Sequence, residues 1–529
     1  MNDISPPRVR QRPEGVEAVG RVVLPRQART VRRDAAPYGR VPLCAGPVLL
    51  ALALGLWGLT REHSMWRDEA ATWQVAHRPL AGTAHMVSQV DVVHGVYYAV
   101  MHEVFALFGD SLVTLRLPSV LATAAACALT TLTGARLSGR RAGVGAGLAL
   151  AVVPAVQEYA QEGRSYALVL AFVALATRLL LAALGRPTAL RWAGYAGAVL
   201  VAALLNWFSL FALVAHGVTM ACLRPDRTRC TGWALAATGA VTGALPLILT
   251  SGEQADQVAW IKPLGWSTVL GVVITVTIAA LCARMAGARL PQRLPEALPE
   301  RLPERLREGV REGVPHARVS LAAVALPLCA VPQIGLAVAS LVKPLYLTRY
   351  VLFAYVGFAL LVGVLLATLI GRVRAHPRVQ LPAAAALAVL ALLPIELRLR
   401  TAESRVDDVL AAAALVDRAR HAADGVLYIP AARRDTALVS PHAFAGLRDL
   451  ALAQGPLESG TLKGIEAAPR AVEQAVADAR RIVLVTDAGP LHADSARDRA
   501  KLRALDEHFV RRSTSVERGR RVSVYERVR

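Results

Sequence analysis

The adjacent carboxylates Asp68 and Glu69 are placed where they could do chemistry, because they follow closely on an apolar run over residues 41–60. If that run is buried in a membrane, the pair lies at the surface, where a water-soluble hydroxyl could meet a lipid-bound group. One of the two could act as a general base, which typically contributes about 10²- to 10⁴-fold in rate. The alternative is structural, since an acidic pair also caps a following helix, here ATWQVAH, through its free amide groups.

A second polar group follows in the same segment and comprises Asp91, His94, Tyr98 and His102. At helical spacing the last three share one face, which could bind a sugar or a phosphate. Two histidines eight residues apart do not make a metal site. The ordinary alternatives are a hydrogen-bonded histidine and a belt of interfacial tyrosines. We predict no metal site here.

Basic residues also occur at the same end of the apolar runs. Arg116, Lys343 and Arg349 lie in positions that the usual bias of membrane proteins towards cytoplasmic arginine and lysine disfavours. They are therefore candidate partners of an anion, such as a lipid headgroup. The alternative for each is a side chain that snorkels to the membrane surface.

The segment QEYAQEGRSY adds Glu158, Glu162 and Arg164 between two apolar runs. The two glutamates are four residues apart and would share a helix face. An exposed ion pair, worth only about 0.5 kcal/mol, is the simplest interpretation of this cluster. Its position near the other polar groups makes it a candidate part of the same site.

The chain that carries these residues is strongly apolar. Of its 529 residues, 54% are hydrophobic and 19% charged, against roughly 25% charged in soluble domains. The net charge of +21 comes mostly from arginines at the N-terminus and in short gaps between apolar runs, a pattern of cytoplasmic loops and not of a nucleic-acid-binding face. Six cysteines form no disulfide or CxxC pattern. We predict a multi-pass plasma-membrane protein in contact with membrane lipids, with no nucleic-acid partner.

Apolar runs of spanning length occur about eleven times. Their approximate centres are Ala51, Ala122, Leu150, Ala174, Ala198, Val214, Ala240, Ile274, Ala330, Leu360 and Val389. If the N-terminus is cytoplasmic, every Arg-rich connection falls on the cytoplasmic side, as the positive-inside rule requires. The candidate residues then all lie on the outer side.

The fold predicted is an α-helical polytopic membrane protein with a small C-terminal α/β extracytoplasmic domain. Residues 1–42 are predicted to be a disordered, basic cytoplasmic tail, and 43–399 the transmembrane domain, with a first outer loop at 61–110 and a cytoplasmic loop at 284–318. Residues 400–529 contain strand-like runs at 425–430, 481–486 and 522–528 between alanine-rich helical stretches.

Five motifs in this order resemble the GT-C integral-membrane glycosyltransferases, and more narrowly the bacterial branch of family 39, relatives of protein O-mannosyltransferases and the aminoarabinose transferase. They are WRDE, D-x-x-H-G-x-Y-Y, G-x-S-x-x-x-L-R-L-P-S, Q-E-x-R-S-Y-A-L and P-L-Y-L-T-R-Y, within residues 43–399. Members commonly have H-P-P-L-Y-Y where this chain has His94-Gly95-Val96-Tyr97-Tyr98. The missing prolines leave the geometry of that loop uncertain.

The resemblance implies an inverting transfer of mannose or another hexose from a polyprenyl-phosphate-linked donor to a hydroxyl of a protein, lipid or glycan. Asp68 matches the family's catalytic aspartate and Glu69 the acidic residue beside it. The donor phosphate is assigned to Arg116, Arg164, Lys343 and Arg349. Substrate binding is assigned to Arg67, Asp91, His94, Tyr98, Glu158 and Glu162. No cofactor is obligate, although the acidic pair could hold a divalent cation.

The principal alternative is a multi-span transporter or a flippase of lipid-linked sugars. Transporters usually carry ionisable or Gly/Pro-broken positions near span centres, often repeated in two halves. Here the charges gather at the outer ends of spans made mostly of alanine, leucine and valine. A role as a mere anchor for the C-terminal domain is disfavoured because an anchor needs one span.

Overall fold

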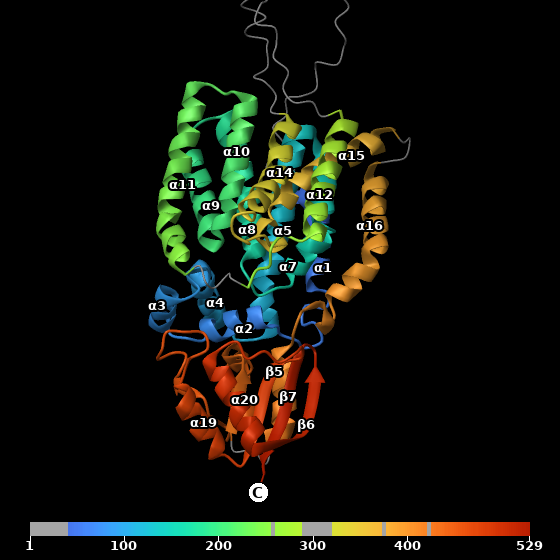
Figure 1. The fold of residues 1–529 in the computed structure, drawn as a ribbon. Helices are drawn as coiled ribbons and strands as arrows, with labels where there is room; N and C mark the ends of the chain where they lie inside the picture. The colour runs from blue at the N-terminus through green and yellow to red at the C-terminus, as the bar shows by residue number, and fades with distance from the viewer. Residues whose placement is uncertain (1–40, 255–259, 288–319, 373–376, 421–424, 529) are drawn as a thin grey trace, which may run out of the picture.

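The computed structural model describes residues 41–254, 260–287, 320–372, 377–420 and 425–528. A helical bundle occupies one end of the molecule and an α/β domain the other, with a thin layer of short helices between them (Figure 1). Most of the predicted basic tail at 1–42 and of the predicted cytoplasmic loop at 284–318 lies outside the described residues.

All eleven predicted span centres fall within helices of the bundle. These helices are α1 (Val41–Leu56), α5 (Leu112–Ser138), α6 (Arg140–Ala151), α8 (Tyr166–Gly185), α9 (Ala189–Leu205), α10 (Leu210–Leu223), α11 (Arg227–Glu253), α12 (Trp266–Met285), α14 (Leu321–Ala339), α15 (Ala354–Arg372) and α16 (Pro377–Leu399).

Not all of these helices reach the length of a full span. Among the described residues, seven are long and apolar enough to cross a membrane alone, and α6 forms an eighth span if it is joined to α7 (Pro154–Ala160) across a bend of 63°. The apolar helices α1, α9 and α10 are shorter. The predicted count of about eleven therefore holds for apolar helices but not for full-length spans.

Small residues allow the central helices to approach closely. A Cβ atom on Gly363 of α15 would lie 2.4 Å from the amide nitrogen of Ala146 and 2.5 Å from the carbonyl oxygen of Ala142, both on α6. A Cβ on Gly143 would lie 2.4 Å from the carbonyl oxygen of Thr131 on α5. Because lipid gives apolar side chains no advantage in burial, such backbone contact is a main source of helix association in membranes.

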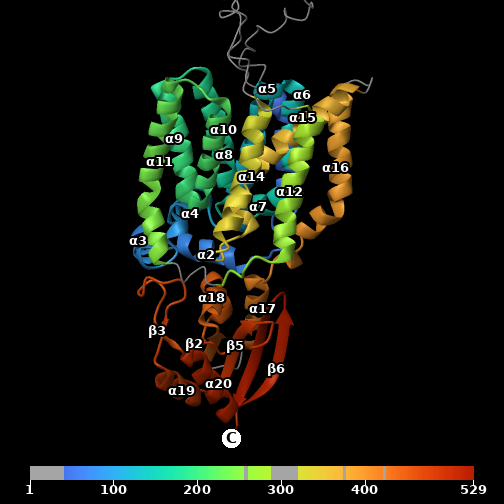
Figure 2. The same cartoon turned by 45° about the horizontal axis from the view of Figure 1, so that its top comes forward.

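The layer between the two ends is built from residues within 61–110, the predicted first outer loop. It contains α2 (Arg67–Ala76), α3 (Leu80–Gln89) and α4 (Gly95–Phe108), with a short 3₁₀ turn, η2 (Val92–His94), before α4 (Figure 2). His94 is the N-cap residue of α4, and its ring packs edge-on against that of Tyr98 with 6.0 Å between the centroids. These two side chains therefore lie side by side at the start of α4.

The C-terminal domain has a five-stranded mixed sheet in the order β2-β1-β5-β7-β6. The three predicted strands correspond to β1, β5 and β7. The strands are β1 (Gly425–Ile429), β2 (Arg448–Asp449), β5 (Arg481–Asp487), β6 (Phe509–Glu517) and β7 (Arg520–Arg527), and a separate hairpin pairs β3 (Leu452–Gln454) with β4 (Ile465–Glu466). Strand β1 pairs in parallel with β2 and β5, and β7 pairs antiparallel with β5 and β6.

Helices cover both faces of this sheet. Helices α19 (Pro469–Ala477) and α20 (Ala496–His508) pack on one face of β1 and β5 through Val472, Val476 and Leu505. Helix α17 (Val409–Ala419) packs on the other face through Leu415 and Val416, and the short helix α18 (Asp435–Val439) follows β1. Strands buried on both sides read as continuous apolar runs, which is why β1 and β5 were recognisable in the sequence.

Segment 407–409 connects the domain to the start of α2. The carboxylate of Asp407 accepts hydrogen bonds from the backbone N–H of Arg67 at 3.1 Å and from the guanidinium of Arg520 at 2.9 Å. The carboxylate of Asp408 accepts from the amide of Met65 at 3.2 Å, and the amide of Val409 donates to the carbonyl of Met65 at 2.8 Å. The residues directly before Asp68 are thereby fixed to the C-terminal domain.

Candidate active site

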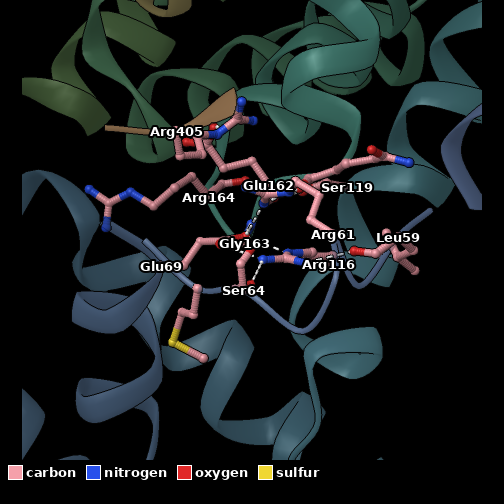
Figure 3. A network of polar contacts seen from close by, with 12 residues as sticks. Leu59, Arg61, Ser64, Glu69, Arg116, Ser119, Glu162, Gly163, Arg164 and Arg405 are labelled. Atoms are coloured by element: carbon pink, nitrogen blue, oxygen red, sulfur yellow. Dashed lines mark hydrogen bonds and ion pairs between the residues drawn. The ribbon is translucent and has the colours of Figure 1, made fainter. Parts of the chain in front are cut away.

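Glu69 lies at the centre of a buried network of polar contacts (Figure 3). Its Oε1 accepts from Arg116 at 2.7 Å, from Arg61 at 3.0 Å and from the backbone N–H of Gly163 at 3.0 Å. Burial by itself raises the pKa of a carboxyl, but the attraction of Arg116 and Arg61 outweighs it and lowers the pKa of Glu69 to about 2. Glu69 is therefore an ionised clamp that joins α2 to α5 and to the link between α7 and α8.

Arg116 also donates hydrogen bonds to backbone carbonyl oxygens. It donates to the carbonyl oxygens of Leu59 at 2.7 Å and Ser64 at 2.6 Å, besides its two contacts with Glu69. Its side chain is fully buried. Arg116 therefore supports Glu69 structurally and does not line either of the cavities described below.

Asp68 points in a different direction from its neighbour because successive residues of a helix are about 100° apart. Its side chain is 24% exposed, lines a cavity, and forms an ion pair with Arg349 at 3.2 Å. Neither carboxylate caps α2, because its N-cap residue is Trp66 and no side-chain cap is formed. The acidic pair thus divides into one buried and one cavity-facing carboxylate.

Arg349 is held among aromatic rings as well as by Asp68. It lies in the 3₁₀ turn η5 (Thr348–Val351), and its guanidinium carbon is 5.9 Å from the ring centroid of Trp66, 5.7 Å from those of Tyr166 and Trp260, and 5.8 Å from that of Tyr350. Cation–π attraction of this kind strengthens where water is excluded. These four rings hold the guanidinium of Arg349 next to Asp68.

Arg164 supplies a second buried cation. It donates to the carbonyl oxygen of Asp68 at 3.3 Å, to the hydroxyl of Thr72 at 3.4 Å and to the hydroxyl of Tyr98 at 3.3 Å. These acceptors are neutral oxygens, and within the described residues Arg164 forms no ion pair with a carboxylate, although Asp68 and Asp91 attract its charge from a distance. The guanidinium of Arg164 can therefore attract an anion bound in the cavity.

Asp91 and His94 also line the cavity, and the hydroxyl of Tyr98 lies between Asp91 and Arg164. The hydroxyl of Tyr98 donates to Asp91, and burial raises the pKa of Asp91 to about 6, a shift that Arg164 and this hydrogen bond reduce. Burial, together with Arg164 and Arg349, lowers the pKa of His94 well below its usual value. His94 is therefore neutral at pH 7, and its 3.8 Å contact with Asp91 is not an ion pair.

Glu158 and Glu162 face away from this cavity and contact Arg405 instead. Arg405 donates to Glu162 at 3.3 Å and to Glu158 at 3.4 Å, from the segment that leads to the C-terminal domain. Burial raises the pKa of Glu162 to about 7, although Arg405 and Arg349 oppose the rise. The two glutamates therefore join the α7–α8 link to the connecting segment.

The cavity beside Asp68 has a volume of about 520 Å³ and lies between the membrane domain and the C-terminal domain. Six of the predicted site residues line it, namely Arg67, Asp68, Asp91, His94, Arg164 and Arg349. Its lining also includes Tyr166 and Trp260, and Arg433 and Lys463 from the C-terminal domain. This volume is within the range of small-molecule sites.

A second, mostly apolar cavity of about 360 Å³ adjoins the first, and the two share Val93, His94 and Tyr350 in their walls. Leu205, Trp207, Phe208, Ile248 and Leu345 supply most of its apolar surface, and Lys343 supplies a cation. The pair of cavities provides a polar compartment next to an apolar one.

The predicted residues thus divide into two groups. Seven line one of the two cavities, whereas Glu69, Tyr98, Arg116, Glu158 and Glu162 lie behind the walls and hold them. The sequence argument missed Trp260, Arg433 and Lys463, which belong to no motif. Within the described residues, no group of three or more His, Cys, Asp or Glu side chains is arranged to hold a metal ion.

The comparison with known proteins agrees with this architecture. Residues 95–251 match the family model described as dolichyl-phosphate-mannose-protein mannosyltransferase. ArnT from Cupriavidus metallidurans bound to undecaprenyl phosphate is similar with a TM-score of 0.56 at 15% identity, covering 92% of this chain and 98% of that chain. The apo state of the same ArnT gives a TM-score of 0.58 at 13% identity with the same coverage. No curated protein sequence matches the chain.

The structural comparisons give information on the fold, and the family model gives information on the family. The structural similarity extends over nearly the whole of both chains, including the C-terminal domain, and at this identity it shows the fold. The family match covers a segment that begins at α4 and ends in α11. The chain therefore has the GT-C fold of a multi-pass membrane protein, and the resemblance of its motifs to the family 39 glycosyltransferases is confirmed.

Proposed function

We propose that this chain is a glycosyltransferase that moves a sugar from a polyprenyl-phosphate-linked donor to an acceptor hydroxyl at the outer face of the plasma membrane. The observation that carries the proposal is the convergence of Asp68, Arg349 and Arg164 on one polar cavity that adjoins an apolar one. A donor with a sugar phosphate and a lipid tail needs both kinds of surface. The undecaprenyl phosphate named for ArnT supports this class of donor.

Asp68 is proposed as the general base. Its carboxylate takes the proton from the acceptor hydroxyl, the acceptor oxygen bonds to the anomeric carbon, and the bond from that carbon to the phosphate oxygen breaks with its electron pair leaving on the lipid phosphate. Attack opposite the departing phosphate inverts the anomeric centre. The ion pair with Arg349 holds the carboxylate of Asp68 at the cavity before a substrate arrives.

The developing charge on the lipid phosphate needs cations in a site with little water, and such electrostatic stabilisation is often the largest catalytic contribution. We assign this role to Arg164 and Arg349, with Lys343 at the apolar cavity. Arg67, Asp91 and His94 are assigned to the sugar or acceptor. No obligate cofactor is proposed, because these side chains supply both the base and the positive charge.

Glu69 and Arg116 are assigned a supporting role that differs from the one implied by the motifs. Their contacts are with each other and with the backbone, and neither lines a cavity. Tyr98, Glu158 and Glu162 likewise support the walls. Mannose or another hexose is proposed as the sugar, the acceptor is a protein, lipid or glycan, and the N-terminus is placed in the cytoplasm with the C-terminal domain outside.

The test is transfer of radiolabelled sugar in membranes that contain the wild type or Asp68→Asn. Polyprenyl-phosphate-linked mannose, glucose, galactose and arabinose are offered with the natural host's acceptors present. We expect Asp68→Asn to lower turnover about 10²- to 10⁴-fold at an unchanged protein level. Asp110→Asn, an exposed carboxylate of the same outer loop, is the matched control and should keep full activity.

Equal turnover in the wild type and Asp68→Asn would contradict the assignment of the base. If no donor is consumed by the wild type, the proposed reaction is wrong. A flipping assay with the same labelled lipids would then test the transporter alternative.

A further inference from the structure

The C-terminal domain supplies one wall of the cavity that contains Asp68. The residues that it supplies are Ala432, Arg433, Asp435, Thr461, Leu462 and Lys463. The last three belong to loop 455–464, which connects strands β3 and β4. A site formed at a junction of two domains is a common place for a second substrate to bind.

Loop 455–464 is fixed to the outer-loop helices. Arg78, which is 7% exposed and lies between α2 and α3, donates to the carbonyl oxygens of Thr461 at 2.9 Å and Pro456 at 3.4 Å. Leu462 packs against the buried cluster of Val75, Met86 and Tyr98. The loop is thereby held on the side of the membrane domain.

The same loop is fixed from within the C-terminal domain. Arg434 donates to the carbonyl oxygen of Lys463 at 2.6 Å and also contacts the carboxylates of Asp449 and Glu466. The buried ammonium of Lys501 holds Glu466 from the other side at 2.8 Å. The backbone of Lys463 is therefore anchored while its side chain stays exposed at the cavity.

The charges that line the cavity differ in how far they are neutralised. Arg349 pairs with Asp68 at 3.2 Å, Arg433 pairs with Asp487 at 2.6 Å, and Arg67 lies 3.6 Å from Asp407. Arg164 donates to neutral oxygens and contacts no carboxylate directly in the part of the chain that the structure describes. Lys463 has no side-chain hydrogen bond or ion pair among the contacts of the described residues.

We propose that Lys463 binds an anionic group of the acceptor, and that loop 455–464 is the wall that selects the acceptor. The inference rests on the proposed function and deepens it by naming the chemical class of the acceptor: a hydroxyl compound that carries a phosphate or carboxylate. Arg164 then serves the donor phosphate and Lys463 the acceptor anion. An ammonium on a flexible stem can meet an anion as a point charge without a fixed orientation.

The experiment uses membranes of the natural host from which the chromosomal copy is deleted, complemented with wild type, Lys463→Gln or Lys463→Arg. The labelled donor that supports wild-type turnover is added, and the products are separated on an anion-exchange column. We expect the wild-type product to bind the column. Lys463→Gln should lower transfer about tenfold or more at low acceptor concentration by raising the KM for acceptor, whereas Lys463→Arg should retain most of it.

Two further measurements distinguish weaker acceptor binding from a general loss of folding or activity. Slow release of labelled sugar to water measures the donor half of the reaction, and it should be equal in wild type and Lys463→Gln. Arg470→Gln, which removes an exposed charge on α19 of the same domain, should transfer normally.

A neutral product, or equal transfer by wild type and Lys463→Gln, overturns the assignment of Lys463. A loss of donor hydrolysis in Lys463→Gln also overturns it, because Lys463 would then belong to the donor site. If Asp68→Asn removes turnover in the same membranes while the Lys463 variants are unaffected, only the acceptor assignment fails and the proposed function stands.

Discussion

Asp68 and Glu69 are separated by one peptide bond and have opposite surroundings. Glu69 is enclosed by Arg61, Arg116 and the amide of Gly163, whereas Asp68 pairs with Arg349 at the edge of a cavity. Removing one partner from a buried ion pair typically costs about 3–5 kcal/mol, because the other charge stays buried without compensation. The buried carboxylate is thus a fixed point from which the cavity-facing one is positioned.

Glu162 should make the protein less stable as the pH rises. Its pKa is about 7 in the folded chain, against 4.5 for a glutamate in water, so the folded state binds more protons than the unfolded state between these pH values. The free energy of unfolding therefore falls as pH increases from about 4.5 to 7. We expect the Tm in detergent to drop over this window and the drop to be smaller in Glu162→Gln.

Asp91, whose pKa is about 6, contributes in the same direction and accounts for a remaining slope in the variant. Glu103→Gln, which removes an exposed carboxylate on α4, is the control and should leave the wild-type profile unchanged. A pH profile of Glu162→Gln that overlays the wild type would show that Glu162 does not titrate in this range.

Several cavity residues could be predicted from the sequence because they occur in short motifs. The motifs could not show that Asp68 faces the cavity while Glu69 is buried behind it. They also did not indicate Arg405, whose contact with Glu158 joins positions 247 residues apart. Trp260 and Lys463 reach the cavity from a loop and from another domain. Contacts of this kind are set by tertiary packing, and no local spacing records them.

At the scale of elements, the apolar runs predicted helices well because hydrocarbon requires each backbone group to be bonded within its own segment. Their lengths were harder to predict, since α6 and α7 meet at a bend of 63° and α9 ends at Leu205 before a 3₁₀ turn, η3 (Trp207–Ser209). Those breaks bring loop residues to the cavities. Leu205, Trp207 and Phe208 line the apolar cavity as a direct result.

The contact between α6 and α15 should not tolerate even one added methyl group. In Gly363→Ala the new Cβ would meet backbone atoms of Ala142 and Ala146, so the helices must separate. Such overpacking typically costs about 1–3 kcal/mol, and we expect a lower Tm in detergent. Gly371→Ala lies on the same helix with nothing within 4 Å of its Cβ, and it should match or exceed the wild-type Tm. Equal Tm values for both variants would contradict the packing argument.

At the scale of the molecule, the C-terminal α/β domain and the outer-loop layer share one end of the bundle (Figure 1). The sheet was predictable from three apolar runs, but its participation in the cavity was not, because Arg433 and Lys463 belong to no motif. Segment 407–409 and loop 455–464 attach the domain at two places. The membrane domain and the C-terminal domain therefore build the cavity together.

The orientation in the membrane can be tested with single cysteines. Native Cys230 is exposed in the first turn of α11, at the end of the bundle that the charge pattern places in the cytoplasm, and Ser515→Cys would lie on exposed strand β6. We expect a membrane-impermeant maleimide to label Ser515→Cys in intact cells and Cys230 only after permeabilisation. The reverse pattern would show that the predicted orientation is wrong. Labelling of both positions in intact cells would contradict the predicted alternation of the helices across the membrane.

The clamp at Glu69 also has a mechanical consequence. It ties the residues after α1, the start of α5 and the α7–α8 link to one carboxylate, and the next residue along the chain is Asp68. Membrane helices tilt to match the thickness of the surrounding bilayer. We therefore expect a tilt of these helices to move Asp68, and the rate of the proposed transfer to depend on the lipid composition of the membrane.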